Sequence, residues 1–260
     1  MSDDRSDALI GYTGFVGSNL LQRHEFEATF NSANIDEIRG RSFDLVVCAG
    51  ARAEKWKANA DPAADLNGIE RLTRALEHVN ARKLVLISTV DVFIEPRGVD
   101  ETSTVHMTGL HAYGRNRRLL EEIAASRFDA TIVRLPALYG HGLKKNVIYD
   151  FLHDHELDKI DSRGTFQFYD IDRLWSDIRV ALDLDLPVVH LPPAPVTVAD
   201  VARVAFGREF VNITRGEPAR YDVQTTYAPL FGGDGRYLVS RDRELEAIAR
   251  FVRRSAARMG

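Results

Sequence analysis

The stretch "ALIGYTGFVGSNLL", residues 8–21, joins a short apolar run to a glycine-rich turn and then to a segment with helical spacing. Gly11, Gly14 and Gly17 follow the pattern G-x-x-G-x-x-G. Glycine permits a tight turn and lets a ligand approach the backbone, and free N–H groups at the beginning of a helix attract negative charge. A simple tight turn is the alternative. Because the glycines lie between an expected strand and an expected helix, the stretch predicts a dinucleotide-binding loop. The contacts are expected from Gly11, Thr13, Gly14, Phe15, Val16 and Gly17.

Outward from this loop, apolar runs of strand length alternate with helix-prone segments. The run at 43–51 ("FDLVVCAGA") is apolar except for one residue, and the run at 83–89 ("KLVLIST") has an apolar centre, which is typical of strands buried on both faces. Asp61 and Pro62 offer an N-cap and a first-turn proline for a helix over 62–79. Further strands are expected at 27–31, 130–140 and 187–191, and helices at 15–24 and from Tyr113 onward. This alternation predicts an α/β fold, a Rossmann-type doubly wound parallel sheet.

The regular pattern weakens after about residue 140, where His, Tyr and Pro become more scattered. We therefore expect residues 1–140 to form mainly the NAD(P)-binding Rossmann domain. Residues 141–260 are expected to form mainly a small C-terminal substrate-binding part, interleaved with the sheet rather than an independent domain.

Composition limits the partners of the chain. It has 260 residues, 28% of them charged, and a net charge of −4, which gives no reason to expect nucleic acid or an anionic membrane. No apolar run approaches the length of a membrane span, and residues 1–10 lack the pattern of a secretion signal. Cys48 is the single cysteine, which fits a reduced compartment, so a cytoplasmic location is expected. His153 and His155 are two residues apart and have no evident third ligand nearby, so no metal site is predicted.

The choice between NAD and NADP stays open. An NAD site uses an acidic residue about 20 positions after the first glycine to bind the ribose. Here that count reaches Asn31, followed by Ser32, and both can bind a ribose hydroxyl without repelling a 2′-phosphate. Arg39 and Arg41 follow in a polar loop and offer positive charge for such a phosphate, although arginines in polar loops are usually solvated.

Several segments, taken in order, resemble the extended short-chain dehydrogenase/reductases, also called NAD-dependent epimerases/dehydratases. The resemblance covers roughly residues 8–250. The matching segments are "GYTGFVG" (11–17), "VVCAGA" (46–51), "ADLNGIERL" (64–72), "LISTVDVF" (86–93), "AYGRNR" (112–117), "IVRLPALYG" (132–140) and "FQFYDIDRLWSDI" (166–178). The resemblance implies a cofactor, NAD or NADP, with further contacts at Ala49, Gly50, Ala51 and Pro136. It also implies a homodimer formed through the helices that contain Asn67 and Tyr113.

By the same resemblance, Thr89 takes the place of the catalytic hydroxyl and Tyr113 that of the acid/base. The family's tyrosine is followed four residues later by a lysine that holds the nicotinamide ribose, and here that position is Arg117. Arginine keeps the charge but does not carry protons. Two function classes follow: an active NAD(P)-dependent oxidoreductase or epimerase, or a catalytically impaired NAD(P)-binding sensor or scaffold. A lysine at 117 restores the family pattern, so Arg117→Lys is expected to retain or raise activity.

The residues after Thr89 bear on the reaction. Sugar-nucleotide dehydratases of the family have Asp-Glu after the hydroxyl residue, whereas here Val90 and Asp91 follow. The segment therefore looks closer to dehydrorhamnose reductases and 4-epimerases, which implies a sugar nucleotide or a related carbonyl or alcohol as substrate. Ligands of open α/β sheets bind beyond the carboxyl ends of strands. Asp91, Lys144, Lys145 and Asn146 are accordingly the candidate substrate contacts.

Overall fold

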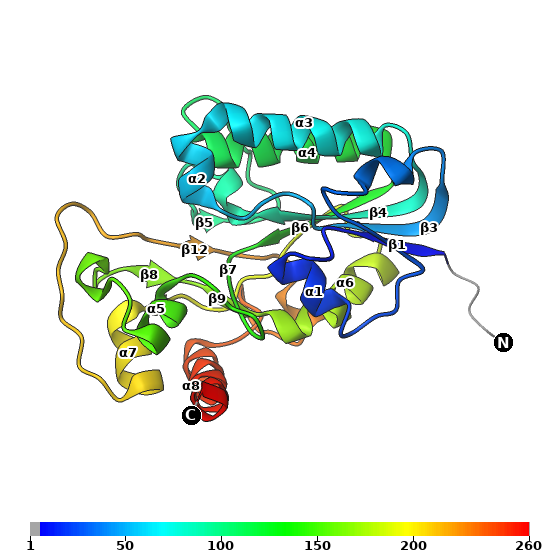
Figure 1. Cartoon of the computed structure of the whole chain (residues 1–260). Coiled ribbons are helices and arrows are strands. Elements are labelled where there is room, and N and C mark those ends of the chain that lie inside the picture. Colours follow the sequence, from blue (N-terminus) through cyan, green and yellow to red (C-terminus); the bar gives the residue numbers. More distant parts are fainter. Residues whose placement is uncertain (1–5, 260) are drawn as a thin grey trace. The chain divides into compact units, whose positions relative to one another are not determined.

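The computed structural model describes residues 6–259, and its chain divides into two compact units (Figure 1). The first unit contains the described residues up to 94, together with 104–135 and 172–189. The second contains residues 95–103, 136–171 and the chain from 190 onward. The expectation that no secretion signal is present rests in part on residues 1–5, which lie outside the described residues.

A six-stranded sheet forms the centre of the first unit, in the order β10-β6-β4-β3-β1-β2. Its strands are β1 (Asp7–Ile10), β2 (Ala28–Phe30), β3 (Ser42–Cys48), β4 (Asn80–Thr89), β6 (Ala130–Leu135) and β10 (Val188–His190). The pairings of β1 with β2 and β3, of β3 with β4, and of β4 with β6 are all parallel. Strands β1 and β3 are mostly buried, as expected for strands that are mainly apolar. The predicted Rossmann-type sheet is therefore confirmed.

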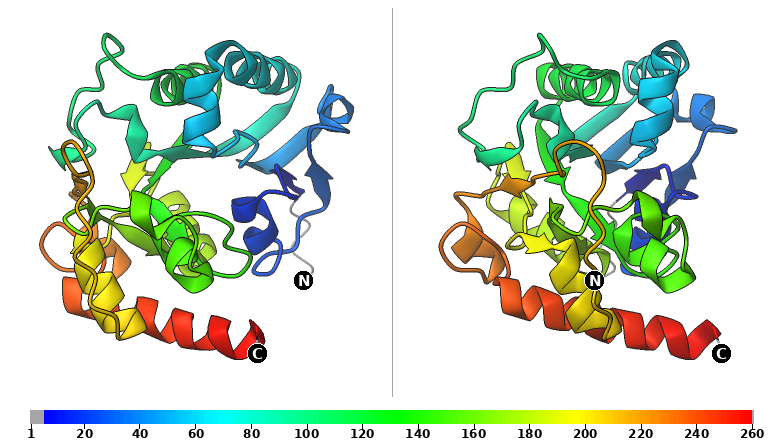
Figure 2. Two further views of the ribbon diagram at one scale, coloured as in Figure 1. Left: turned by 60° about the vertical axis from the view of Figure 1, so that its left-hand side comes forward. Right: turned by 90° about the vertical axis from the view of Figure 1, so that its left-hand side faces the viewer.

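Helices cover both faces of this sheet. The helices α3 (Pro62–Leu76) and α4 (Ala112–Arg127) lie side by side on one face, and α1 (Phe15–Leu20) and α6 (Leu174–Asp183) lie on the other (Figures 1 and 2). The expected cap of α3 is present, because the Asp61 side chain accepts a hydrogen bond from the Ala64 N–H at 3.0 Å. Two short helical segments, α2 (Lys55–Ala60) and a 3-10 turn η2 (Val90–Val92), follow the ends of β3 and β4. A further 3-10 turn, η1 (Ile35–Ile38), follows β2.

One expected helix is shorter than the sequence predicted. The segment 15–24 forms a helix only as far as Leu20, and a turn follows. Leu20 is buried, but Leu21 is 39% exposed, so its apolar side chain does not extend the packed face.

The second unit is built from short pairs of strands and from helices. The pairs are β5 (Arg97–Val99) with β12 (Asp222–Val223), β7 (Ala137–Tyr139) with β9 (Phe168–Asp170), and β8 (Thr165–Phe166) with β11 (Val196–Thr197). The helical segments of this unit are α5 (Val147–His153), η3 (Leu157–Lys159), α7 (Val198–Phe206), η5 (Ala228–Phe231) and α8 (Arg241–Met259). A 3-10 turn, η4 (Ile171–Arg173), lies where the chain passes from the second unit to the first and precedes α6. The single strand expected at 130–140 is divided at Pro136 into β6 and β7, since proline has no N–H for a sheet ladder.

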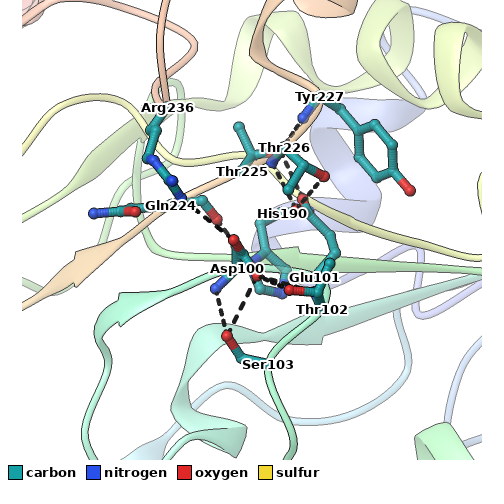
Figure 3. Close-up of polar contacts among 10 residues, drawn as sticks. All are labelled: Asp100, Glu101, Thr102, Ser103, His190, Gln224, Thr225, Thr226, Tyr227 and Arg236. Carbon is teal, nitrogen blue, oxygen red and sulfur yellow. Dashed lines mark hydrogen bonds and ion pairs between the residues drawn. The ribbon is translucent and has the colours of Figure 1, made fainter.

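Side chains stabilise the second unit where its ladders are short. Glu101 accepts hydrogen bonds from the His190 N–H at 2.8 Å and the Thr225 hydroxyl at 2.6 Å through Oε1. Its Oε2 accepts from the N–H and the hydroxyl of Thr226, at 2.9 and 3.2 Å (Figure 3). One carboxylate thus joins three segments of the chain. Its charge makes these hydrogen bonds stronger than those to a neutral acceptor.

Among the described helices, none combines the length and the apolar character that a membrane crossing requires.

Candidate active site

The glycine loop has the backbone geometry that a phosphate cradle needs. Gly11 has φ of 88°, and a Cβ there would lie 2.3 Å from the Ala49 carbonyl oxygen. A Cβ at Gly17 would lie 2.2 Å from the Gly11 oxygen, so neither position accepts a side chain. At Gly14 the nearest atom to a Cβ is the Gly11 oxygen, at 3.3 Å, and nothing else lies within 4 Å. One face of the loop is therefore open at Gly14.

The first turn of α1 matches this opening. Gly14 is the N-cap, and no side chain caps the helix. The first N–H groups of a helix lack partners within the helix, so here they are free of any side-chain acceptor. Phe15, Val16 and Gly17 carry these groups. An open backbone face and uncapped N–H donors fit a dinucleotide pyrophosphate, which needs close approach and hydrogen-bond donors.

Two further strand ends lie beside the loop. The Gly11 N–H donates to the Phe30 carbonyl at 2.7 Å, and the Ala49 N–H donates to the Ile10 carbonyl at 2.8 Å. Ala49, Gly50 and Ala51 come directly after β3, and Asn31 and Ser32 directly after β2. The predicted cofactor residues of β1, β2 and β3 are therefore brought together at the carboxyl edge of the sheet.

The expected ribose position is a polar turn. The Asn31 side-chain oxygen accepts from the Ala33 N–H at 2.8 Å, and its own N–H donates to Asn34 at 2.7 Å. Ser32 is exposed. The two nearby arginines have other partners: Arg39 pairs with Asp36 at 3.2 Å, and the Arg41 guanidinium lies 4.9 Å from the Phe43 ring centroid.

Thr89 and Tyr113 meet where β4 ends and α4 begins. Thr89 is the last residue of β4, and its side chain accepts from the Asp91 N–H at 3.1 Å. The Thr89 side chain lies near enough to the Tyr113 hydroxyl to oppose the rise of its pKa. The Tyr113 N–H donates to the Asn59 side chain of α2 at 3.0 Å, which attaches α2 to the start of α4. Both residues are buried, with 9% and 7% of their surface exposed. This proximity allows both hydroxyls to reach one substrate oxygen.

The start of α4 approaches the backbone of η2 closely, which restricts the residue that can follow Tyr113. A Cβ at Gly114 would lie 2.1 Å from the Asp91 carbonyl oxygen, so only glycine fits after Tyr113. His111 caps α4 by accepting from the Gly114 N–H at 3.0 Å, and burial lowers the pKa of its imidazole. The neutral ring is the form that can accept this bond.

Arg117 is buried under the tyrosine ring. Its Cζ lies 4.0 Å from the Tyr113 ring centroid, and only 3% of the residue is exposed. Nη1 donates to the Asp65 carboxylate of α3 and, at 3.4 Å, to the Tyr113 carbonyl, and Nη2 donates to the Arg52 carbonyl. The Nε atom is buried without a hydrogen-bond partner. Arg117 is therefore not a solvated surface residue.

The pKa of Tyr113 is raised from its ordinary value, because burial disfavours the phenolate. Arg117 acts in the opposite direction, followed by the Thr89 side chain and the charge of Lys55, while Asp91 adds to the rise. The positive charge of Arg117 thus acts to lower the pKa of Tyr113, but burial outweighs it.

Lys55 and Asp91 form an ion pair beside the same corner. The Lys55 Nζ lies 2.8 Å from Asp91 Oδ1, and both side chains are partly exposed. This pair connects α2 to η2. The Asp91 carboxylate is therefore oriented by Lys55. Trp56, the residue after Lys55, is 67% exposed.

The remaining predicted residues belong to the second unit. Pro136 is buried between β6 and β7, and Lys144 and Lys145 are exposed. Asn146 is the N-cap of α5, accepting from the N–H groups of Ile148 and Tyr149, and its amide nitrogen donates to the Leu138 carbonyl at 2.8 Å. Its side chain thus has a structural role of its own. No group of three or more potential metal ligands occurs within residues 6–259.

The largest hollow that we describe lies elsewhere in the first unit. It has a volume of about 1090 Å³ and is lined by residues that include Asp7, Lys83 and Trp175. Asp7 begins β1, so this hollow is at the amino edge of the sheet, opposite Thr89. It contains none of the predicted site residues.

Asp65 is the partner that the sequence did not reveal. Asn67, which resembled the family's helix motif, is exposed, whereas Asp65 binds both Asn116 and Arg117 of α4. Helix spacing within α3 predicts which residues share a face, but it does not show which residue of α4 lies opposite. Once the structure shows that Arg117 is buried, an acidic partner is required, but the sequence alone carried no signal for this burial.

The sequence pattern of the NAD dependent epimerase/dehydratase family matches residues 22–159, more than half of the chain. The chain belongs to this family. The match includes Thr89, Tyr113 and Arg117 but begins after the glycine loop. A search of curated protein sequences finds no match.

Solved structures of epimerases and reductases have the same fold. A UDP-N-acetylglucosamine 4-epimerase from Methanobrevibacter ruminantium M1, in complex with UDP-N-acetylmuramic acid, has a TM-score of 0.73 at 14% identity, covering 98% of this chain and 99% of that one. A dTDP-4-dehydrorhamnose reductase from Bacillus anthracis str. Ames, in complex with NADP, has a TM-score of 0.71 at 19% identity, covering 98% and 100%. MoeE5, in complex with UDP-glucose and NAD, has a TM-score of 0.68 at 17% identity, covering 96% and 99%. At these identities the likeness shows the fold alone.

Proposed function

We propose that this member of the epimerase/dehydratase family is an NAD(P)-dependent oxidoreductase or epimerase that acts on a sugar nucleotide or a related carbonyl or alcohol. The observation that carries the proposal is the corner formed by Thr89, Tyr113 and Arg117. There a hydroxyl pair lies beside a buried guanidinium 4.0 Å from the tyrosine ring.

In this proposal the glycine loop and each residue of the corner have a defined task. Gly11, Gly14 and the uncapped N–H groups of α1 bind the pyrophosphate. The nicotinamide, when bound, supplies or accepts a hydride. Tyr113 gives a proton to the substrate oxygen when a carbonyl is reduced and takes it back when an alcohol is oxidised, and Thr89 orients that oxygen. Arg117 supplies fixed positive charge and, through Nε, one hydrogen-bond donor for a ribose hydroxyl.

The proposed substrate class rests on the residues that follow β4 and on the solved structures with the same fold. Val90 is apolar and Asp91 is paired with Lys55 at 2.8 Å, so the acid and base needed to eliminate water are not both present after Thr89. Reduction or epimerisation at a carbonyl carbon needs only the hydroxyl pair and a hydride. Of the similar structures named above, two contain a bound UDP-sugar and the third is a dTDP-4-dehydrorhamnose reductase, which supports a nucleotide-linked sugar as the substrate here. Lys144 and Lys145 are the proposed contacts for its phosphates.

A homodimer through α3 and α4 is part of the proposal. Leu66, Leu119 and Ile123 on these helices are only partly buried within the chain. They offer apolar surface for a second copy. Light scattering at micromolar concentration should give twice the chain mass, and a monomeric mass would contradict the dimer.

Cofactor binding provides the first test of the proposal. Titration of NADH and NADPH fluorescence should show saturable binding by the wild type and at least a tenfold weaker affinity for Gly14→Val, whose side chain would occupy the open face of the loop. Gly68→Val is the matched control, because a Cβ at Gly68 on α3 meets nothing within 4 Å. Equal binding by all three proteins would overturn the loop assignment.

Turnover provides the second test and separates the enzyme from the alternative, a catalytically impaired sensor or scaffold. Arg117 in the lysine position and the raised pKa of Tyr113 are the observations that favour this alternative. The assay is oxidation of NAD(P)H with 4-keto dTDP-sugars and interconversion of UDP-hexoses with bound NAD. Turnover that requires Tyr113 supports the enzyme. Tight cofactor binding without turnover on this panel supports the sensor.

A further inference from the structure

The side chain of Arg117 is oriented from three sides by groups of the first unit. Asp65, from the first turns of α3, accepts from Nη1, and the Arg52 carbonyl after β3 accepts from Nη2. The third contact is the face of the Tyr113 ring. Four of the guanidinium's five N–H bonds point from Nη1 and Nη2, so these partners fix the plane of the group and leave its Nε edge without a partner.

Asp65 is itself held in place. Its Oδ2 accepts from the Asn116 side chain at 2.8 Å as well as from Arg117, and 9% of its side chain is exposed. Asn116 and Arg117 are consecutive residues of α4, so one carboxylate oxygen of α3 receives two neighbouring donors of α4. A buried carboxylate placed in this way strongly favours a cation at position 117.

This arrangement changes what a lysine at position 117 would do. An ammonium is a compact point charge without a preferred plane, whereas the guanidinium is flat and can contact a carboxylate, a carbonyl and a ring together. Beside Asp65, a lone ammonium would pair with the carboxylate and move away from the Tyr113 ring. The sequence-based expectation that Arg117→Lys retains or raises activity takes no account of Asp65.

We propose that Asp65 is a positioning residue that acts as one unit with Arg117, holding the guanidinium over the Tyr113 ring so that the pair together replaces the family's single lysine. A lysine can serve at position 117 only when the carboxylate at position 65 is removed. The kinetic part of this inference rests on the proposed function, but the position of the cation relative to Tyr113 does not.

Tyr113 itself reports on this position. The other groups that act on its hydroxyl are Asp91, Lys55 and Thr89, and His111 lies with its ring centroid 6.3 Å away. None of these is altered in the variants below. Displacing the cation from the ring should raise the pKa of Tyr113, because a nearby positive charge stabilises the phenolate.

The experiment measures tyrosine ionisation by ultraviolet difference titration, subtracting the Tyr113→Phe spectrum in each background, together with the pH profile of kcat/KM where turnover is found. In Arg117→Lys, the Tyr113 pKa should rise by about half a unit or more, and kcat/KM should fall roughly tenfold. In Asp65→Asn/Arg117→Lys, the pKa should fall below that of the single variant, and kcat/KM should recover to within about threefold of the wild type.

Asp61→Asn/Arg117→Lys is the matched control. It removes a carboxylate from the same helix one turn away, and asparagine is an equally good N-cap, so no recovery is expected. If Arg117→Lys does not fold, Asp65→Glu serves instead. It keeps the charge but displaces the guanidinium, and should raise the Tyr113 pKa, whereas Asp61→Glu should not.

Recovery in the Asp65 double variant alone supports the proposal, and the titration supports it even if no substrate is turned over. A Tyr113 pKa in Arg117→Lys equal to that of the wild type would overturn it, as would a double variant no better than the single one. Loss of melting temperature without change in the Tyr113 titration would also overturn it, because a merely structural ion pair predicts that result.

Discussion

Two buried ion pairs involve neighbouring turns of α4, and they differ in how completely they are satisfied. One joins Glu121 to Arg134 of β6, and the other joins Arg117 to Asp65 of α3. Glu121 is fully buried, and its two oxygens accept four hydrogen bonds. The donors are the Ser88 hydroxyl at 2.6 Å, Arg134 Nε and Nη2 at 2.9 and 2.7 Å, and Arg118 Nη1 at 3.1 Å.

Arg117 lacks this complete set. Its Nη1 and Nη2 have partners, but Nε does not, although the atom is buried. A buried donor without an acceptor costs about 1–3 kcal/mol, so such groups are rare and call for an explanation. Glu121 and Arg134 connect α4 to the sheet. The unpartnered Nε of Arg117 is the basis of our proposal that this donor serves a bound cofactor.

The largest expected effect is on turnover. Tyr113→Phe should lower kcat by about 10²–10⁴-fold, because the substrate oxygen loses its proton donor and acceptor. Cofactor affinity should stay within about threefold of wild type, since the ring and its contact with Arg117 remain. Tyr149→Phe on α5 is the control in the same assay. Undiminished turnover by Tyr113→Phe would show that Tyr113 does not transfer the proton. The Arg117–Asp65 pair would then have no catalytic role to distinguish it from the Glu121–Arg134 pair.

The satisfied pair should have the larger effect on stability. Glu121→Gln leaves Arg134 buried beside a neutral amide, so the free energy of unfolding should fall by about 3–5 kcal/mol. Urea denaturation followed by circular dichroism measures this change. Glu122→Gln, the exposed neighbour on α4, should change it by less than about 1 kcal/mol. Similar values for the two variants would contradict a structural role for the Glu121 network.

The incomplete pair should be replaceable without loss of stability. In Asp65→Leu/Arg117→Met, both charges and the unpartnered Nε are removed together, and hydrophobic replacement of a buried pair is often neutral or stabilising. We expect the free energy of unfolding to stay within about 1 kcal/mol of wild type, while NAD(P)H affinity and turnover fall. Preserved cofactor affinity would mean that Arg117, like Glu121, serves the fold alone.

The smallest expected effect is on alkaline stability. The folded-state pKa of Tyr113 is raised by burial, so its contribution to stability is complete below the unfolded value of about 10 and is lost as the pH rises above it. Melting temperatures measured from neutral pH into this range should fall less steeply for Tyr113→Phe than for wild type. Parallel curves would indicate that the Tyr113 pKa is not raised.

The sequence predicted a doubly wound parallel sheet because this depends on local patterns, and the resemblance to the family assigned Thr89, Tyr113 and Arg117 to one site. Apolar runs between glycines and caps determine where strands end, and parallel strands bring their carboxyl ends to one edge. The same patterns correctly gave Asp61 as the cap of α3. They did not predict that α1 ends at Leu20, because apolar spacing alone does not show where a short helix stops.

The partners of Arg117 could not be predicted because they come from distant segments. Asp65 lies 52 residues before Arg117 and the Arg52 carbonyl 65 residues before it, and contacts of this kind depend on how α3 and α4 pack. The direction in which the pKa of Tyr113 is shifted could not be predicted for a related reason. Sequence spacing showed the nearby cation, whereas the degree of burial, which has the larger effect, is a property of the packed structure.

The most direct test of the account is a crystal structure of the chain with NADP bound. We expect Nε of Arg117 to donate to a hydroxyl of the nicotinamide ribose at about 2.7–3.2 Å, with Asp65 and the Arg52 carbonyl keeping their contacts with the guanidinium. The Tyr113 hydroxyl should face the nicotinamide beside Thr89. A ribose bound away from Arg117, with Nε still without a partner, would contradict the central claim that this arginine performs the task of the family's lysine.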